Sequence, residues 1–170
     1  RRMMGAKENK PRWKRCVELV DGLLGEDLGR RYVAERYPPE VKARMDELVA
    51  GVEGGLARTL DALPWMGPAT KARAKAKLAA MENKVGYPAV WRDYSSVRID
   101  RADLHGSVAS AVDFEFRRQL AKIGRPVDRG EWWMTPPTVN AYYSSSLNSI
   151  NFPAGILQPP FFDRAIDDPV

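Results

Sequence analysis

The chain has 170 residues, of which 44% are hydrophobic and 29% are charged. This length and balance are typical of about one globular domain and exclude global disorder. The 27 basic and 22 acidic residues give a net charge of +5, which alone is weak evidence for a nucleic-acid partner. Basic and acidic residues are interleaved, as in residues 42–47, so we interpret them as solvated helix faces and expect no nucleic-acid partner.

No stretch approaches the roughly 18 consecutive apolar residues of a membrane span, and no apolar signal core follows the first arginines. We therefore expect no membrane span in this chain. It begins with Arg1 and Arg2 instead of a methionine, which suggests that it is cut out of a longer polypeptide. Cys16 is the single cysteine, and we expect it to be a small buried residue on a helix or to pair with a cysteine upstream of the chain.

The first two-thirds of the chain has a helical period. Apolar spacing predicts a helix over residues 13–24 and a short second helix around 28–33, which ends before Pro38. A longer apolar stripe predicts a helix of about six turns that ends at Pro64. The members of this stripe are Val41, Met45, Leu48, Val49, Val52, Leu56, Leu60 and Leu63.

Two more helices are predicted before the period changes. One runs from Pro68 to Gly86, with Ala74, Leu78, Met81 and Val85 facing inward and lysines on a solvated side. Asp103 is suited to cap the other, which ends near Gly124. Its apolar residues are Leu104, Val108, Ala111, Val112, Phe116 and Leu120.

After residue 130 the hydrophobic period changes from 3.6 to 2. Residues 139–143 and 150–152 alternate between polar and apolar, with a polar turn between them, which predicts a β-hairpin. The fold class is therefore mainly α with a C-terminal β-hairpin. We divide the chain into a helical region over residues 1–130 and a region over 131–170 that holds the hairpin and an apolar wall.

The chain offers few groups for catalysis. One histidine and one cysteine cannot build a zinc site, which almost always takes three or four such ligands. No H-E-x-x-H zinc motif and no Gly-rich phosphate loop occurs. We expect His105 to be a surface or helix-start residue, and we expect no catalytic or metal-binding residue in this chain.

The residues after position 130 could instead bind a peptide. An extended peptide can add to an exposed strand edge, where the amide of Asn140 can donate and accept hydrogen bonds and the main chain of Ala141 offers further contacts. The alternative is a structural hairpin in which Asn140 caps a turn, and the residues alone do not separate the two. The apolar wall is either a pocket for a substrate side chain or plain core; it comprises Phe152, Ile156, Leu157, Phe161 and Phe162.

Several stretches resemble the neprilysin and endothelin-converting-enzyme family of zinc metalloendopeptidases. The matching stretches span nearly the whole chain and are residues 7–16, 29–33, 59–66, 84–88, 140–143 and 152–162. The combination of NAYY at 140–143 with FPAGILQPPFF at 152–162 is very specific. The resemblance implies that the chain is part of a thermolysin-like metallopeptidase domain.

The resemblance also implies roles for named residues. In that family an Asn-Ala pair holds the substrate main chain, which assigns this role to Asn140 and Ala141. The pocket for the residue after the scissile bond is assigned to Ile156, Phe161 and Phe162. The implied reaction is hydrolysis of peptides on the amino side of large hydrophobic residues by zinc-activated water, with two histidines and two glutamates on segments that this chain lacks.

The resemblance implies an incomplete catalytic domain. The chain stops at Val170, before the zinc-binding helix of the family would begin, so we expect the zinc ligands to lie in a missing C-terminal segment of the parent and the family's N-terminal helical portion to be missing too. We expect this chain alone to be inactive and to bind peptide substrates in a parent that is exported, membrane-anchored or soluble and bacterial. The rival hypothesis is a non-catalytic helical module that binds peptides or proteins.

Overall fold

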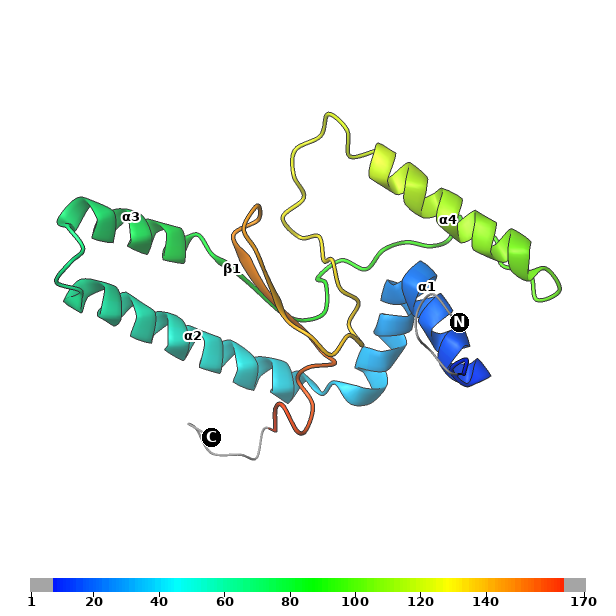
Figure 1. Ribbon diagram of the computed structural model, residues 1–170, viewed down its shortest axis with the longest axis horizontal. Coiled ribbons are helices and arrows are strands. Elements are labelled where there is room, and N and C mark those ends of the chain that lie inside the picture. Colours follow the sequence, from blue (N-terminus) through cyan, green and yellow to red (C-terminus); the bar gives the residue numbers. More distant parts are fainter. Residues whose placement is uncertain (1–7, 164–170) are drawn as a thin grey trace. The chain divides into compact units, whose positions relative to one another are not determined.

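The computed structural model describes residues 8–163, which form two compact units (Figure 1). The first unit comprises residues 8–30 and 90–128, and the second comprises 31–89 and 129–163. Helices dominate the first unit, whereas the second combines helices with a small sheet. The fold class is mainly α with a β-hairpin toward the C-terminal end, as predicted. Our division of the chain after residue 130 stays a prediction.

The first unit is built from α4 (Leu104–Leu120) and most of α1 (Arg12–Arg36). α1 consists of the two predicted helices joined at a kink, where Leu24 leaves the helical region with φ −128° and ψ 36°. Asp103 caps α4 as predicted, because its side chain accepts a hydrogen bond from the N–H of Gly106 at 2.9 Å. No helix in residues 8–163 is both long and apolar enough to cross a membrane.

Burial in the first unit is lower than we predict from the apolar stripes. Ala111 is the one fully buried residue of α4, and four of the other apolar residues that we assign to this helix are exposed: Leu104, Val112, Phe116 and Leu120. Cys16 is exposed, which contradicts the expected burial. Two helices and one connecting segment offer too little surface to cover both stripes. His105 lies exposed in the first turn of α4, as predicted.

An ion-pair network joins the two helices of the first unit. The guanidinium of Arg92 lies 2.9 Å from a carboxylate oxygen of Glu26 on α1 and 3.3 Å from one of Glu115 on α4. Arg118 donates to both oxygens of Glu115 at 2.8 Å. These hydrogen bonds, chiefly those from Arg118, lower the pKa of Glu115 to about 2 although partial burial opposes the shift. The charged form of Glu115 therefore stabilises this unit.

The second unit contains the predicted long helix, α2 (Pro39–Ala62), which lies side by side with α3 (Pro68–Ala79) (Figure 1). Each helix has a proline in its first turn, where the missing N–H costs nothing. Only the N-terminal half of the predicted α2 stripe reaches the core. Val52 and Leu56 are exposed, because the sheet covers only the first turns of the helix.

The prediction of a helix from Pro68 to Gly86 is wrong at its C-terminal end. α3 ends at Ala79, and β1 (Glu82–Gly86) follows. β1 pairs in parallel with β3 (Ser149–Pro153), so its hydrogen-bond partners lie more than sixty residues away and outweigh the local helical pattern.

The predicted hairpin is present. β2 (Tyr142–Ser144) pairs antiparallel with β3, and the strand order is β1-β3-β2. The predicted polar turn joins the two strands, and Asn148 adopts a left-handed conformation in it, with φ 49°. The Oδ1 of Asn148 accepts a hydrogen bond from the hydroxyl of Tyr143 at 3.0 Å, and its Nδ2 donates to the carbonyl of Lys77 at 2.9 Å. The hairpin turn is therefore tied to the last turns of α3.

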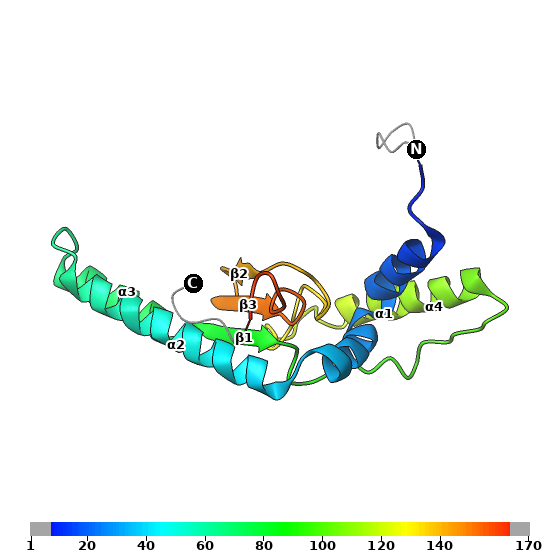
Figure 2. The ribbon, with the colours of Figure 1, turned by 90° about the horizontal axis from the view of Figure 1, so that it is seen from below.

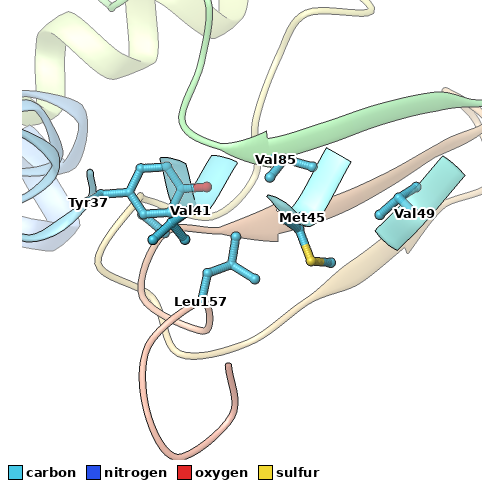
Figure 3. Packing of buried hydrophobic residues seen from close by; sticks show 7 residues of the cluster. Tyr37, Val41, Met45, Val49, Val85 and Leu157 are labelled. Carbon is cyan, nitrogen blue, oxygen red and sulfur yellow. The ribbon is translucent and has the colours of Figure 1, made fainter. Parts of the chain in front are cut away.

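The core of the second unit lies between α2 and one face of the sheet. Figure 2 shows the three strands side by side, with β1 nearest to α2. Val41, Met45 and Val49 project from α2 toward Val85 and Leu157 (Figure 3). Burying such side chains contributes about 1.5–3 kcal/mol each. This packing fixes which face of the sheet is apolar.

Two glycines allow close backbone approaches near the sheet. Gly86 has a φ of 88°, and a Cβ there would lie 2.6 Å from the ring of Tyr37. A Cβ on Gly155 would lie 2.4 Å from the carbonyl oxygen of Pro137. The N–H of Gly155 donates to the carbonyl of Pro136 at 2.8 Å. Gly155 therefore lets the segment over residues 131–138 dock against the turn that follows β3.

We expect the first unit to lose stability in acid. A carboxyl group whose pKa is lowered by folding stabilises the protein above its unfolded pKa, so the contribution of Glu115 is lost as the pH falls from about 4.5 toward 2. Hydrogen exchange of the α4 amides between pH 6 and 2.5 measures this loss, and Glu115→Gln should flatten the pH dependence. The control is Asp113→Asn, which removes an exposed ion pair on the same helix. Equal profiles for Glu115→Gln and the unmodified protein would contradict the assignment.

Gly155→Ala should lower the free energy of unfolding by about 1–3 kcal/mol, because the new methyl group would overlap backbone atoms of residues 137 and 138. Urea denaturation measures the change. Gly51→Ala on α2 is the matched control, since a Cβ there meets nothing within 4 Å, and it should be neutral or stabilise by up to about 1 kcal/mol. Two variants of equal stability would show that the approach at Gly155 is not tight.

Candidate functional site

β1 and β2 are the two edge strands of the sheet, and the candidate site lies at the edge of β2. In the order β1-β3-β2, β2 is hydrogen-bonded to β3 on one side only within the described residues. Asn140 and Ala141 directly precede β2 and are both exposed. The prediction that they belong to the strand itself is therefore corrected by one or two residues, since pairing with β3 begins at Tyr142. Both residues still directly precede the strand that forms the open edge.

The side chain of Asn140 is held by a hydrogen bond from the main chain of the next residue. Its Oδ1 accepts a hydrogen bond from the N–H of Ala141 at 2.8 Å. Within residues 8–163 the side chain makes no other hydrogen bond, so its amide nitrogen is left as an exposed donor. A fixed amide donor beside an open strand edge suits an incoming main-chain carbonyl.

Tyr142 and Asn151 anchor the start of β2. Asn151 is fully buried, and its Nδ2 donates to the carbonyls of Tyr142 at 3.3 Å and of Ser149 at 3.1 Å. The hydroxyl of Tyr142 accepts a hydrogen bond from the N–H of Trp133 at 2.9 Å. Burial is the main cause that raises the pKa of Tyr142, so the phenol is neutral at physiological pH. The edge thus begins at a residue held from two sides.

The segment over residues 131–138 lies against the sheet face that is turned away from α2. Paired residues of neighbouring strands share a face, and the residues facing this way include the buried Lys84 and Asn151. The ammonium of Lys84 donates to the carbonyl of Glu131 at 2.9 Å. Together with the Gly155 to Pro136 hydrogen bond, this contact fixes the segment at both ends.

The three residues predicted to line a pocket follow β3 but differ in exposure. Ile156 and Phe162 are half-buried and pack on the core cluster of the second unit. Phe161 is 68% exposed. The carbonyl of Gln158 accepts hydrogen bonds from the N–H groups of both phenylalanines, at 3.0 and 3.1 Å, and thereby forms the turn that carries them. The ring of Phe161 is therefore exposed, whereas Ile156 and Phe162 are held by packing on the core.

The described residues do not form a metal site. In the part of the chain from residue 8 to residue 163, no three His, Cys, Asp or Glu side chains gather in a way that could hold a metal ion. Cys16 and His105 lie exposed on two different helices. The donor set does not fit zinc, and we derive no chemical step through a metal from these residues.

Sequence reasoning missed three residues that support the edge. Asn151 and Lys84 are buried polar residues in short strands, and nothing in a local pattern distinguishes them from exposed ones. Trp133 left a weak signal, because the pair of tryptophans at 132 and 133 stands just before the predicted hairpin. In the structure Trp132 is buried, whereas Trp133 stacks on Tyr142.

Comparisons with known proteins find relatives that match nearly the whole chain. Sequence profiles described as peptidase family M13 match residues 1–88 and 140–170. Human neprilysin is 34% identical over 168 residues, which cover 94% of this chain and 22% of neprilysin. Human endothelin-converting enzyme 1 is 35% identical over 175 residues, which cover 96% of this chain and 22% of that enzyme. The chain thus spans about a fifth of the length of these relatives.

A solved structure matches as well. The zinc metalloprotease ZMP1 of Mycobacterium tuberculosis, in complex with an inhibitor, is 49% identical and superimposes with a TM-score of 0.86 over 96% of this chain and 24% of ZMP1. The fold is thus part of a thermolysin-like metallopeptidase domain, as the resemblance implies. With one family profile covering more than half of its length, the chain belongs to peptidase family M13, the neprilysin and endothelin-converting-enzyme family of zinc metallopeptidases.

Proposed function

We propose that this chain supplies the substrate-binding edge of a zinc metalloendopeptidase. In this proposal Asn140 and Ala141 hold the main chain of an extended peptide along β2. The observation that carries it is the exposed position of both residues directly before the edge strand β2. Strand addition supplies affinity through main-chain hydrogen bonds and leaves selectivity to side-chain pockets.

The fixed geometry of the edge supports the proposal. Asn151 and Trp133 hold Tyr142, so the residues before it start from a defined point. A preformed edge loses less conformational entropy when a peptide binds than a mobile loop would. The amide nitrogen of Asn140 is available to a substrate carbonyl without breaking a hydrogen bond of the protein.

We further propose that Ile156, Phe161 and Phe162 contact a large hydrophobic side chain, so that cleavage falls on its amino side. Phe161 supports this role because an exposed aromatic ring beside a half-buried apolar pair would gain from covering by another apolar group. The pocket would be shaped from the core side by Ile156 and Phe162, which are fixed by packing.

Hydrolysis itself is assigned to groups outside the described residues. Family M13 is zinc-dependent, and zinc in such a peptidase activates water for attack on the peptide carbonyl. The chain contains one histidine and one cysteine, too few ligands for a zinc site of its own. We therefore expect residues 1–170 on their own to bind peptides without cleaving them and the whole protein to cleave them.

The competing function is a non-catalytic module that binds peptides or proteins. This function is favoured by the absence, among residues 8–163, of any cluster of three or more His, Cys, Asp or Glu side chains that could hold a metal ion. The two functions differ in one measurable property, because only the peptidase turns over a fluorescence-quenched peptide in a reaction that a zinc chelator stops. Peptide binding by the whole protein without turnover would favour the module.

Asn140→Ala in the whole protein should lower kcat/KM for peptides about 2- to 10-fold, the equivalent of one uncharged hydrogen bond of about 0.5–1.5 kcal/mol. The loss should be similar for peptides that differ in their side chains, because the contact is to the substrate main chain. Initial rates on a set of quenched peptides measure it.

The matched control is Asn83→Ala, which removes an exposed asparagine from β1, the strand at the other edge of the sheet. It should leave the rates within twofold of the unmodified protein. If Asn83→Ala lowers the rates and Asn140→Ala does not, the peptide binds along β1 instead of β2, which would contradict the proposal.

A further inference from the structure

We propose that Trp133 determines specificity in peptide binding: with Tyr142 it forms an aromatic platform that takes an aromatic side chain of the substrate. This inference rests on the proposed function and extends it to a substrate residue other than the one near Phe161. The two rings lie nearly parallel, with centroids 5.4 Å apart and planes 11° apart.

The indole of Trp133 is open to a ligand. Trp133 is 60% exposed, whereas Tyr142, on which its ring stacks, is half-buried. A single exposed tryptophan needs no explanation by itself. Here, however, the ring is stacked on the residue that directly follows Asn140 and Ala141, at the start of the open edge. The exposed aromatic surface and the edge therefore adjoin.

The platform is held rigidly. The N–H of Trp133 donates to the hydroxyl of Tyr142, so backbone and ring are fixed to the same side chain. The preceding residue, Trp132, is buried, and the carbonyl of Glu131 accepts from the buried ammonium of Lys84. A ring anchored in this way loses little entropy when a ligand stacks on it.

The register of an added strand brings a substrate side chain to this platform. Tyr142 is paired with Asn151 and stacks on Trp133, so its side chain lies on the sheet face that carries the aromatic platform. A peptide paired along the edge places a side chain on that face opposite Tyr142, with about 4.5–5.5 Å between Cβ atoms. That side chain lies within reach of the stacked pair.

The chemistry of the platform favours an aromatic substrate residue. Aromatic rings pack on one another in offset or edge-on contacts that add to the gain from burial. An acidic residue is disfavoured, because it would meet the negative charge of Glu131, which adds to the effect of burial in raising the pKa of Tyr142. The expected order at this position is Phe or Tyr first, then Ala, then Glu.

The test uses the whole protein and quenched peptides that carry Phe or Ala at one position at a time on either side of the scissile bond. At one position, distinct from the residue just after the scissile bond, the protein should prefer Phe. Trp133→Ala should reduce that Phe-over-Ala ratio of kcat/KM about 2- to 10-fold, and Trp133→Phe should retain most of it. The matched control, Trp65→Ala, removes a tryptophan that is 73% exposed in the turn between α2 and α3, and should keep the ratio.

Two results would overturn the inference: no Phe preference at any such position, or an unchanged Phe-over-Ala ratio in Trp133→Ala, whether the rates on both peptides are unchanged or equally lowered. Equal losses would indicate that Trp133 only supports the fold. Asn140→Ala, measured on the same peptides, separates this failure from that of the proposed function. If Asn140→Ala lowers all rates while the Trp133 ratio does not change, the edge binds peptides without an aromatic platform.

Discussion

The packing of α2 against the sheet is the interaction on which the rest of the second unit depends. Because side chains alternate across a strand, burying Val85 and Phe152 toward α2 turns Lys84 and Asn151 to the opposite face. There the ammonium of Lys84 and the amide nitrogen of Asn151 donate to main-chain carbonyls, while the Oδ1 of Asn151 is buried without a partner among the described residues. The apolar contact on one face thus decides the polar contacts on the other, and those contacts hold the open edge of β2.

The sequence was sufficient for features with a strong local period. The stripe of α2 and the hairpin after residue 130 both follow from spacing alone, and the capping role of Asp103 follows from its place before an apolar run. It was insufficient for β1, since residues 82–86 have no clear alternation and become a strand only by pairing with β3. The sequence was also insufficient to show that the apolar side of α4 is largely exposed. An amphipathic pattern indicates which face of a helix can be covered and not whether a partner covers it.

The candidate site was located by resemblance more than by physical pattern. Spacing left Asn140 equally suited to a turn cap or to a substrate contact, and in the structure its Oδ1 serves the local role while its nitrogen stays exposed. The local hydrogen bond therefore leaves the amide nitrogen available for the proposed substrate contact. A short local hydrogen bond orients the amide, and the oriented amide is what an incoming peptide can use.

The central claim is that a peptide adds to the open edge of β2, next to Asn140 and Ala141. Hydrogen exchange of the whole protein, with and without a saturating peptide whose scissile bond cannot be cleaved, tests it most directly. The account predicts slower exchange at the amides of residues 139–144 and no change at those of β1. Protection of β1 with unchanged exchange at 139–144 would contradict it.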